Sequence, residues 1–154
     1  MLIRKFAPED VENLSRLIIQ NLRHVNIRDY SAESIEALVP YYTPDQIISL
    51  SKTCYMIVSV HGADLVGTAT LDGDRVRNVF TDIDMHKKGI GRLLMADLEA
   101  YAIENNLTKI YLHAGLSAQD FYSKLGYETI KRIEHELDGN PLPVIKMEKV
   151  LSKA

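Results

Sequence analysis

A short run of glycines and cations, His86-Lys87-Lys88-Gly89-Ile90-Gly91-Arg92, has residue types and spacing that predict a specific chemistry. It follows the strand-like segment 76–80 and precedes apolar residues that recur at helical spacing. Glycines let the backbone approach a ligand closely, and the first amides of a helix lack partners and lie at its positive end. Together these features predict a site at which main-chain N–H groups bind a phosphate or pyrophosphate.

Two familiar phosphate-binding motifs do not match this run. A Walker A loop places a Lys-Ser/Thr pair after its last glycine, where this chain has Arg92-Leu93. A dinucleotide-binding fingerprint places Gly or Ala three residues after Gly91, where this chain has Leu94. A GxG by itself also fits a helix that begins with a flexible turn and solvated lysines, so the phosphate site needs support from the rest of the chain.

Composition favours a soluble globular protein of a single domain, which we place at residues 1–154. The 154 residues are 46% hydrophobic and 25% charged, with a net charge of −3, so no global basic field favours nucleic acid or an anionic membrane as a partner. Cys54 is the single cysteine and is expected to be a small apolar strand residue. Without a membrane-spanning stretch or the apolar run of a secretion signal, a reducing cytoplasm is the compartment favoured.

The expected order of elements places the glycine run inside a strand–helix–strand unit of an α+β fold. Seven strands are predicted, over residues 2–6, 54–60, 65–71, 75–81, 109–113, 128–137 and 144–151. They should form a central, mostly antiparallel mixed sheet flanked by about four helices. Ser31 and Thr43 are positioned as N-caps of two helices, and residues 117–125 form a further short helix that Gly126 ends.

This order, with two segments, resembles the GNAT superfamily of N-acetyltransferases over nearly the whole chain. The first segment is the glycine run, written Q/R-x-x-G-x-G/A in the family. The second, A-x-x-F-Y-x-K-x-G-F/Y in the family, reads Ala118-Gln119-Asp120-Phe121-Tyr122-Ser123-Lys124-Leu125-Gly126-Tyr127 here. The resemblance implies acetyl-CoA as donor, no metal, and transfer of the acetyl group to a primary amine of a small molecule or peptide. Because relatives are often dimers, it also favours a homodimer.

The resemblance assigns cofactor-binding residues by position. The backbone amides of Lys87, Lys88, Gly89, Ile90, Gly91 and Arg92 would bind the pyrophosphate. The backbone of Val79, Phe80 and Thr81 would pair with the pantetheine arm, in a slot opened where this strand splays from segment 109–113. An N–H near Val79 or Phe80 would also face negative charge that develops on the carbonyl oxygen.

Tyr122 matches the family's usual general acid. A phenol with a pKa of about 10 can protonate a leaving thiolate, whose thiol has a pKa near 8.5. Tyr122 also lies on one helical stripe with Ala118, Phe121 and Leu125, so a role in the hydrophobic core is the alternative.

The chain departs from the family pattern at three positions. His86 stands where the family has Gln or Arg, and Gly115 stands where many relatives have Asn. The segment 75–80 holds no carboxylate that could act as general base, which leaves the base open, with His113 as a secondary candidate. The missing carboxylate motivates an alternative function, a non-catalytic module of the same fold that binds a CoA thioester.

Two features bear on the acceptor. Arg75 and Arg77 alternate along one strand and therefore point to the same side. If that side faces the acceptor cleft, they indicate a substrate with a carboxylate or phosphate; if it faces solvent, they carry no functional information. The segment 24–42, with Tyr30, Tyr41 and Tyr42, corresponds to the family's variable helices on the acceptor side.

Overall fold

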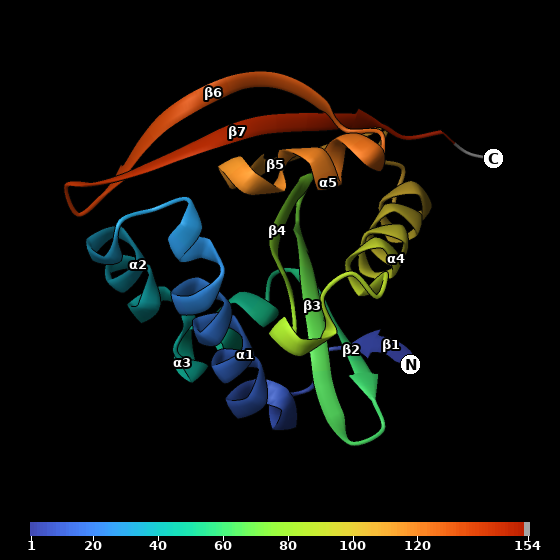
Figure 1. The fold of residues 1–154 in the computed structure, drawn as a ribbon. Coiled ribbons are helices and arrows are strands. Elements are labelled where there is room, and N and C mark those ends of the chain that lie inside the picture. The colour runs from blue at the N-terminus through green and yellow to red at the C-terminus, as the bar shows by residue number, and fades with distance from the viewer. Residues whose placement is uncertain (153–154) are drawn as a thin grey trace.

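Seven strands form one mixed sheet in the order β1-β2-β3-β4-β5-β7-β6 in the computed structural model, which describes residues 1–152 (Figure 1). The strands are β1 (Leu2–Lys5), β2 (Tyr55–His61), β3 (Asp64–Asp72), β4 (Arg75–Thr81), β5 (Lys109–Ala114), β6 (Glu128–Leu137) and β7 (Asn140–Val150). Only the β4–β5 pair is parallel, because the long crossover that contains the glycine run connects these two strands. The predicted mixed, mostly antiparallel sheet is confirmed.

Five α-helices are present among the described residues, one more than the approximate number expected. They are α1 (Val11–His24), α2 (Ala32–Leu38), α3 (Pro44–Ser51), α4 (Ile90–Glu104) and α5 (Gln119–Lys124). Ser31 caps α2 by accepting from the Ser34 N–H, and Thr43 caps α3 by accepting from the Gln46 N–H, as predicted. No helix within residues 1–152 is long and apolar enough to cross a membrane.

Helices cover both faces of the sheet. Helices α1, α2 and α3 lie on one side of strands β2–β4, and α4 lies on the other (Figure 1). α4 packs closely on β3 at Gly67, where an added Cβ would lie 3.0 Å from side-chain atoms of Ile90 and Leu94 and 2.5 Å from Ser59 Oγ of the neighbouring strand β2. Glycine at this position therefore lets the first turns of α4, and with them the glycine run, pack directly onto the sheet.

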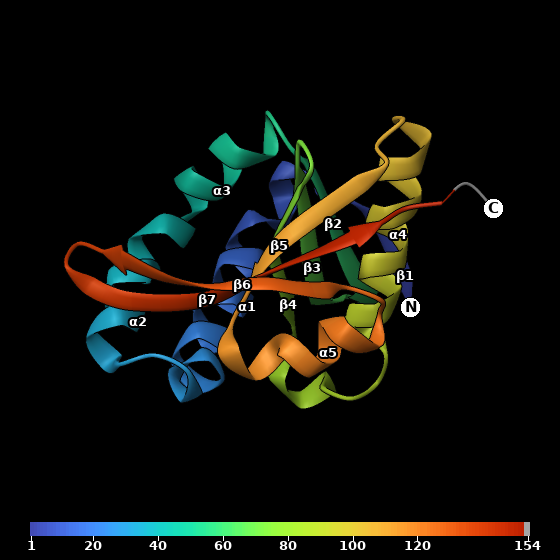
Figure 2. The ribbon, with the colours of Figure 1, turned by 90° about the horizontal axis from the view of Figure 1, so that it is seen from above.

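The last hairpin begins its second strand earlier than expected. β7 starts at Asn140 rather than near residue 144, because Asp138 and Gly139 form a two-residue turn with positive φ values of 52° and 80°. The hairpin reaches beyond the sheet to α2 (Figure 2), where the Ser34 hydroxyl donates to the Pro141 carbonyl at 2.6 Å. The predicted helix at 117–125 is also shorter, because Leu116–Ala118 form a 3₁₀ turn ahead of α5.

Candidate active site

The parallel strands β4 and β5 meet at one end and separate at the other. Their register pairs only Arg75 with Tyr111 and Val76 with Leu112, so from Arg77 onward the edge of β4 that faces β5 has no strand partner. The separation opens a cavity of about 940 Å³, lined by both strands, the loop into α4, α5, and the segment from α1 to the turn before α3. The predicted slot between these strands is therefore present.

The loop into α4 presents a row of free backbone donors to this cavity. Lys87 and Gly89 have positive φ values of 65° and 79°, and Gly89 caps α4 without a side chain. The first α-helical bond of α4 runs from the Leu93 N–H to the Gly89 carbonyl at 3.1 Å. Within residues 1–152, no acceptor is found for the N–H groups of residues 87–92. Such donors at a helix start bind anions.

The second glycine of the run is required by packing between helices. A Cβ on Gly91 would lie 3.0 Å from Cζ of the Phe121 ring, which α5 lays over the start of α4. Gly89 differs, because a Cβ there would meet nothing within 4 Å and only its positive φ favours glycine. Glycine is therefore favoured at the two positions for different reasons: packing against Phe121 at Gly91, and the backbone conformation at Gly89.

A β-bulge interrupts β4 beside the cavity. Phe80 pairs with Thr68 and Arg77 pairs with Thr70, so one residue of β3 opposes two of β4, and Asn78 there has a φ of 57°. The Tyr42 hydroxyl donates to Oδ1 of Asn78 at 3.0 Å. Sequence reasoning missed both the bulge and this bond; an Asn within an apolar strand was the signal available.

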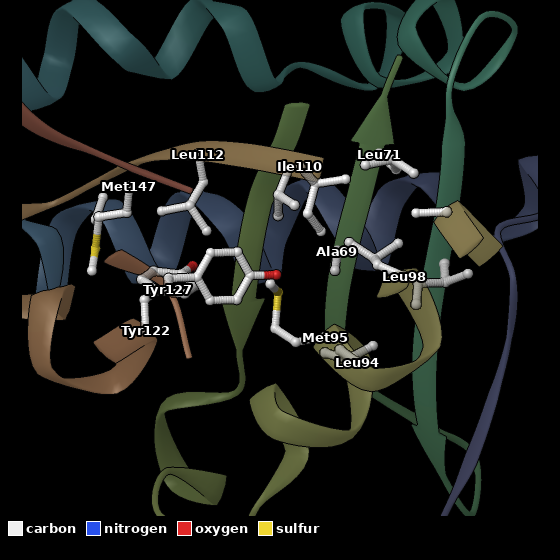
Figure 3. Packing of buried hydrophobic residues seen from close by; sticks show 14 of the residues in the cluster. Ala69, Leu71, Leu94, Met95, Leu98, Ile110, Leu112, Tyr122, Tyr127 and Met147 are labelled. Carbon is white, nitrogen blue, oxygen red and sulfur yellow. The ribbon is translucent and has the colours of Figure 1, made fainter. Parts of the chain in front are cut away.

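Tyr122 lies at the junction of the cavity and the hydrophobic core. Tyr122 is 8% exposed, lines the cavity, and packs edge-on against Phe121 and Tyr127. Figure 3 shows Tyr122 and Tyr127 within the buried hydrophobic cluster. The Tyr122 hydroxyl has no hydrogen-bond partner within residues 1–152, whereas the neighbouring Tyr127 hydroxyl donates to Glu99 at 2.9 Å. Burial raises the pKa of Tyr122, so the phenol is protonated at neutral pH. Core packing and access to the cavity thus coexist in one residue.

His113 lies on the cavity wall beside Arg75, His135 and Lys146. Its Nδ1 is 3.4 Å from Nη2 of Arg75, its ring centroid is 5.4 Å from that of His135, and Lys146 is its register partner on β7. Burial, followed by the charges of Arg75, His135 and Lys146, lowers the pKa of His113 to about 4. Because a guanidinium only donates, Nδ1 is the accepting nitrogen, and the neutral ring carries its proton on Nε2.

A carboxylate that the sequence did not single out ties the segment after α1 to the turn before α5. Asp29 accepts from the backbone N–H of Ser117 at 3.1 Å and from its hydroxyl at 2.8 Å. Oδ2 of Asp29 also lies 3.0 Å from the position a Cβ on Gly115 would take. Nothing in the local sequence around Asp29 marks this role, because the contact joins residues 88 positions apart.

The cavity brings together nearly all of the site residues predicted from the sequence. Those that line it are Val79, Phe80, Thr81, Lys87, Gly89, Ile90, Gly91, Arg92, His113 and Tyr122; Lys88 does not. The Thr81 carbonyl is already engaged, since it accepts from Nδ2 of Asn21 at 2.9 Å and from Nε2 of His86 at 3.3 Å. His86 is therefore a half-buried residue that braces the loop.

The sequence model of the Acetyltransferase (GNAT) domain family matches residues 26–151. The chain belongs to the GNAT family. It is 27% identical over 118 residues to the peptidyl-lysine N-acetyltransferase YjaB of Salmonella typhimurium, covering 77% of this chain and 74% of that protein. Membership of the GNAT family makes this protein an N-acetyltransferase.

Solved GNAT structures share the fold over the full chain. A GCN5-related N-acetyltransferase from Rhodopseudomonas palustris superposes with a TM-score of 0.92 at 22% identity, covering 97% of this chain and 95% of that one. The PaiA N-acetyltransferase of Thermoplasma acidophilum, solved in complex with coenzyme A, superposes with a TM-score of 0.80 at 19% identity, covering 97% and 98%. At these identities the likeness shows the GNAT fold.

Proposed function

We propose that this single-domain enzyme transfers the acetyl group of acetyl-CoA to a primary amine of a small molecule or peptide by direct attack, with Tyr122 as general acid. One observation carries the proposal: the same cavity is lined by Tyr122, whose hydroxyl has no partner within residues 1–152, and by Lys87 and residues 89–92, whose N–H groups have no acceptor there. The name of the Salmonella relative, which specifies a lysine side chain as acceptor, supports an amine as the nucleophile.

The residues present fit coenzyme A. The N–H groups of residues 87–92, with the cations of Lys87 and Arg92 at the cavity, match a pyrophosphate in charge and in hydrogen bonding. The backbone edge of Val79, Phe80 and the Thr81 N–H would hold an amide-containing arm, since no strand pairs with that side of β4. Acetyl-CoA would supply a thioester, whose carbonyl carbon accepts the amine and whose sulfur leaves.

Tyr122 completes the proton balance of the transfer. As the C–N bond forms and the C–S bond breaks, the phenol gives its proton to the departing sulfur, and the proton lost by the amine restores the phenol through solvent. Burial raises the pKa of Tyr122, and the same dry surroundings make a thiolate more basic, so the proton transfer stays feasible. General acid assistance of this kind contributes about 10²–10⁴-fold. A backbone N–H of Val79 or Phe80 would face the carbonyl oxygen.

His113 is the secondary catalytic candidate, as acceptor of the amine proton directly or through water. Its ring is neutral at pH 7, because its pKa is lowered to about 4. The contact with Arg75 occupies its accepting nitrogen, so His113 becomes a base once Arg75 leaves Nδ1. An acceptor whose amine has a low pKa needs no stronger base than water.

The experiment measures cofactor binding and chemistry separately. Acetyl-CoA should raise the melting temperature of the protein, and an amine panel should yield free thiol together with a mass increase of one acetyl group on the amine. Gly89→Glu should fold, at some cost from the positive φ, because an added Cβ there meets no atom within 4 Å. It should lose the thermal shift through charge repulsion with the pyrophosphate. Binding without transfer to any amine would refute the proposed transferase reaction.

A further inference from the structure

One end of the cavity holds an arginine without an anionic partner. Arg75 lines the cavity, its Nε is buried with no hydrogen-bond partner, and no carboxylate of residues 1–152 lies within 4.0 Å of its guanidinium. The contrast with Arg77, two residues along β4, is direct. Nη1 of Arg77 is 2.9 Å from Asp72, so its charge is already neutralised within the protein.

The side chains around Arg75 do not compensate its charge. Within residues 1–152, its one polar side-chain contact is the 3.4 Å approach of Nη2 to Nδ1 of His113, a neutral group. Lys146 adds positive charge beside His113, and the influence of Arg75, His135 and Lys146 on the pKa of His113 reflects their proximity. Two carboxylates line the cavity, Asp29 and Glu136. Asp29 is engaged with Ser117, and Glu136 is exposed on β6.

The guanidinium of Arg75 has donor capacity that residues 1–152 do not use. Nε–H and the Nη2 group form one edge of the guanidinium, the edge that binds both oxygens of a carboxylate or phosphate. On Arg75 this edge has an unpartnered Nε and only the long contact to His113 at Nη2. The neutral imidazole of His113 carries its proton on Nε2 and adds a further donor.

We propose that the amine acceptor carries an anionic group, a carboxylate or phosphate, which is bound by Arg75 with His113 beside it. The proposal rests on the proposed acetyltransferase function and names its substrate class. It places the acceptor's anion at the end of the cavity where β4 and β5 still pair, while its amine reaches toward Tyr122. Acceptors that are purely cationic would meet the repulsion of Arg75 and Lys146.

The test compares amines that differ only in the anion. ω-Amino acids from β-alanine to 6-aminohexanoate are compared with alkylamines of the same length, and O-phosphoethanolamine is compared with ethanolamine. We expect kcat/KM about 10- to 100-fold higher for the anionic member of at least one pair, the range typical of a charge-assisted hydrogen bond. The carboxylate and phosphate series identify which anion is bound.

Variants assign the preference to Arg75. Arg75→Gln should remove the preference for the anionic member of the pair, mainly through KM, and Arg75→Lys should keep part of that preference. Arg77→Gln removes the same charge from the same strand but should retain the preference, because Arg77 is paired with Asp72. Circular dichroism and melting temperature verify that each variant is folded.

Two outcomes overturn the inference while leaving the acetyltransferase function intact: equal kcat/KM for every anionic and neutral pair, or a preference that survives Arg75→Gln. If no amine is acetylated, the proposed function fails, and binding then decides the inference alone. Titration of the CoA-bound protein with 4-aminobutyrate and with butylamine, followed through the His113 ring resonances in NMR, should show saturation only for the carboxylate. Absence of saturation would overturn the anion site.

Discussion

The Tyr42 hydroxyl donates a 3.0 Å hydrogen bond to the side-chain oxygen of Asn78, at the bulge of β4. Tyr42 comes from the 3₁₀ turn Val39–Tyr42, and it also packs edge-on against Phe80, with ring centroids 6.1 Å apart. A residue of the N-terminal helical segment thus braces the strand that should hold the pantetheine arm. The bond therefore joins the bulge of β4, beside the expected pantetheine slot, to the helical segment expected to contact the amine acceptor.

Asn78→Ala should be less stable than Asn78→Gly by about 1 kcal/mol. Both changes remove the bond to Tyr42, but only alanine is strained by the φ of 57° that glycine adopts freely. Urea denaturation of the two variants measures this difference. Equal stabilities would mean that the bulge relaxes on substitution.

Tyr42→Phe should lower the free energy of unfolding by about 1 kcal/mol, because the Asn78 side chain loses its donor. We also expect a higher KM for acetyl-CoA, since the bulge sets the position of Val79 and Phe80. Steady-state kinetics and urea denaturation provide the two readouts. If Tyr42→Phe keeps the wild-type KM for acetyl-CoA, the bulge does not influence acetyl-CoA binding.

Gly91→Ala should weaken acetyl-CoA binding through packing rather than charge. Its Cβ would lie 3.0 Å from the Phe121 ring, and that ring is 37% exposed and so can move outward. The shift would displace α5, which carries Tyr122. We expect a several-fold rise in KM, measured by thiol release, with partial rescue in the double variant Gly91→Ala, Phe121→Ala. If the double variant shows no rescue, the rise in KM comes from the loop backbone and not from the clash with Phe121.

Tyr122→Phe should preserve acetyl-CoA binding and lower kcat by about 10²–10⁴-fold, the usual contribution of a general acid. Tyr127→Phe is the matched control, because this neighbouring phenol donates to Glu99 and does not line the cavity. The control should lose stability but keep its turnover. Thermal shifts with acetyl-CoA and thiol release measure the two properties. Unchanged turnover of Tyr122→Phe would remove this residue from the mechanism.

His113 should make the protein less stable in mild acid. The pKa of His113 is about 4 in the folded protein, against an ordinary value of 6.5, because of burial and the charges of Arg75, His135 and Lys146. Two other charged residues, Glu136 and Arg77, line the same cavity as His113. As pH falls below 6.5 the unfolded chain binds a proton at this residue while the folded protein does not, so stability falls until about pH 4.

Urea denaturation at several pH values measures this dependence, and His113→Gln should lose less stability than the wild type between pH 6.5 and 4. The comparison uses the slope with pH, so a constant loss from the substitution itself does not affect it. A slope identical to that of the wild type would show that His113 is solvated and titrates normally.

The sequence determined the fold class and the position of the donor loop, because both depend on short-range patterns. Short runs rich in β-branched and apolar residues indicate strands such as β2 and β3, and the glycines with their cations mark the start of α4. The hairpin turn at Asp138-Gly139 was recognisable too, although β7 extends four residues further toward it than the pattern indicated. The resemblance located Tyr122, but its family role remains a prediction.

The tertiary structure alone decided which residues share the cavity. Asp29 and Ser117 are 88 positions apart, Tyr42 and Asn78 are 36 apart, and Arg75 and His113 are 38 apart, so no local pattern could pair them. Alternation along the strand made Arg75 and Arg77 equivalent. The tertiary structure distinguishes them, because Arg77 is paired with Asp72 whereas Arg75 is not. Spacing along the chain fixes which face a side chain takes, whereas its partners depend on segments that only folding brings together.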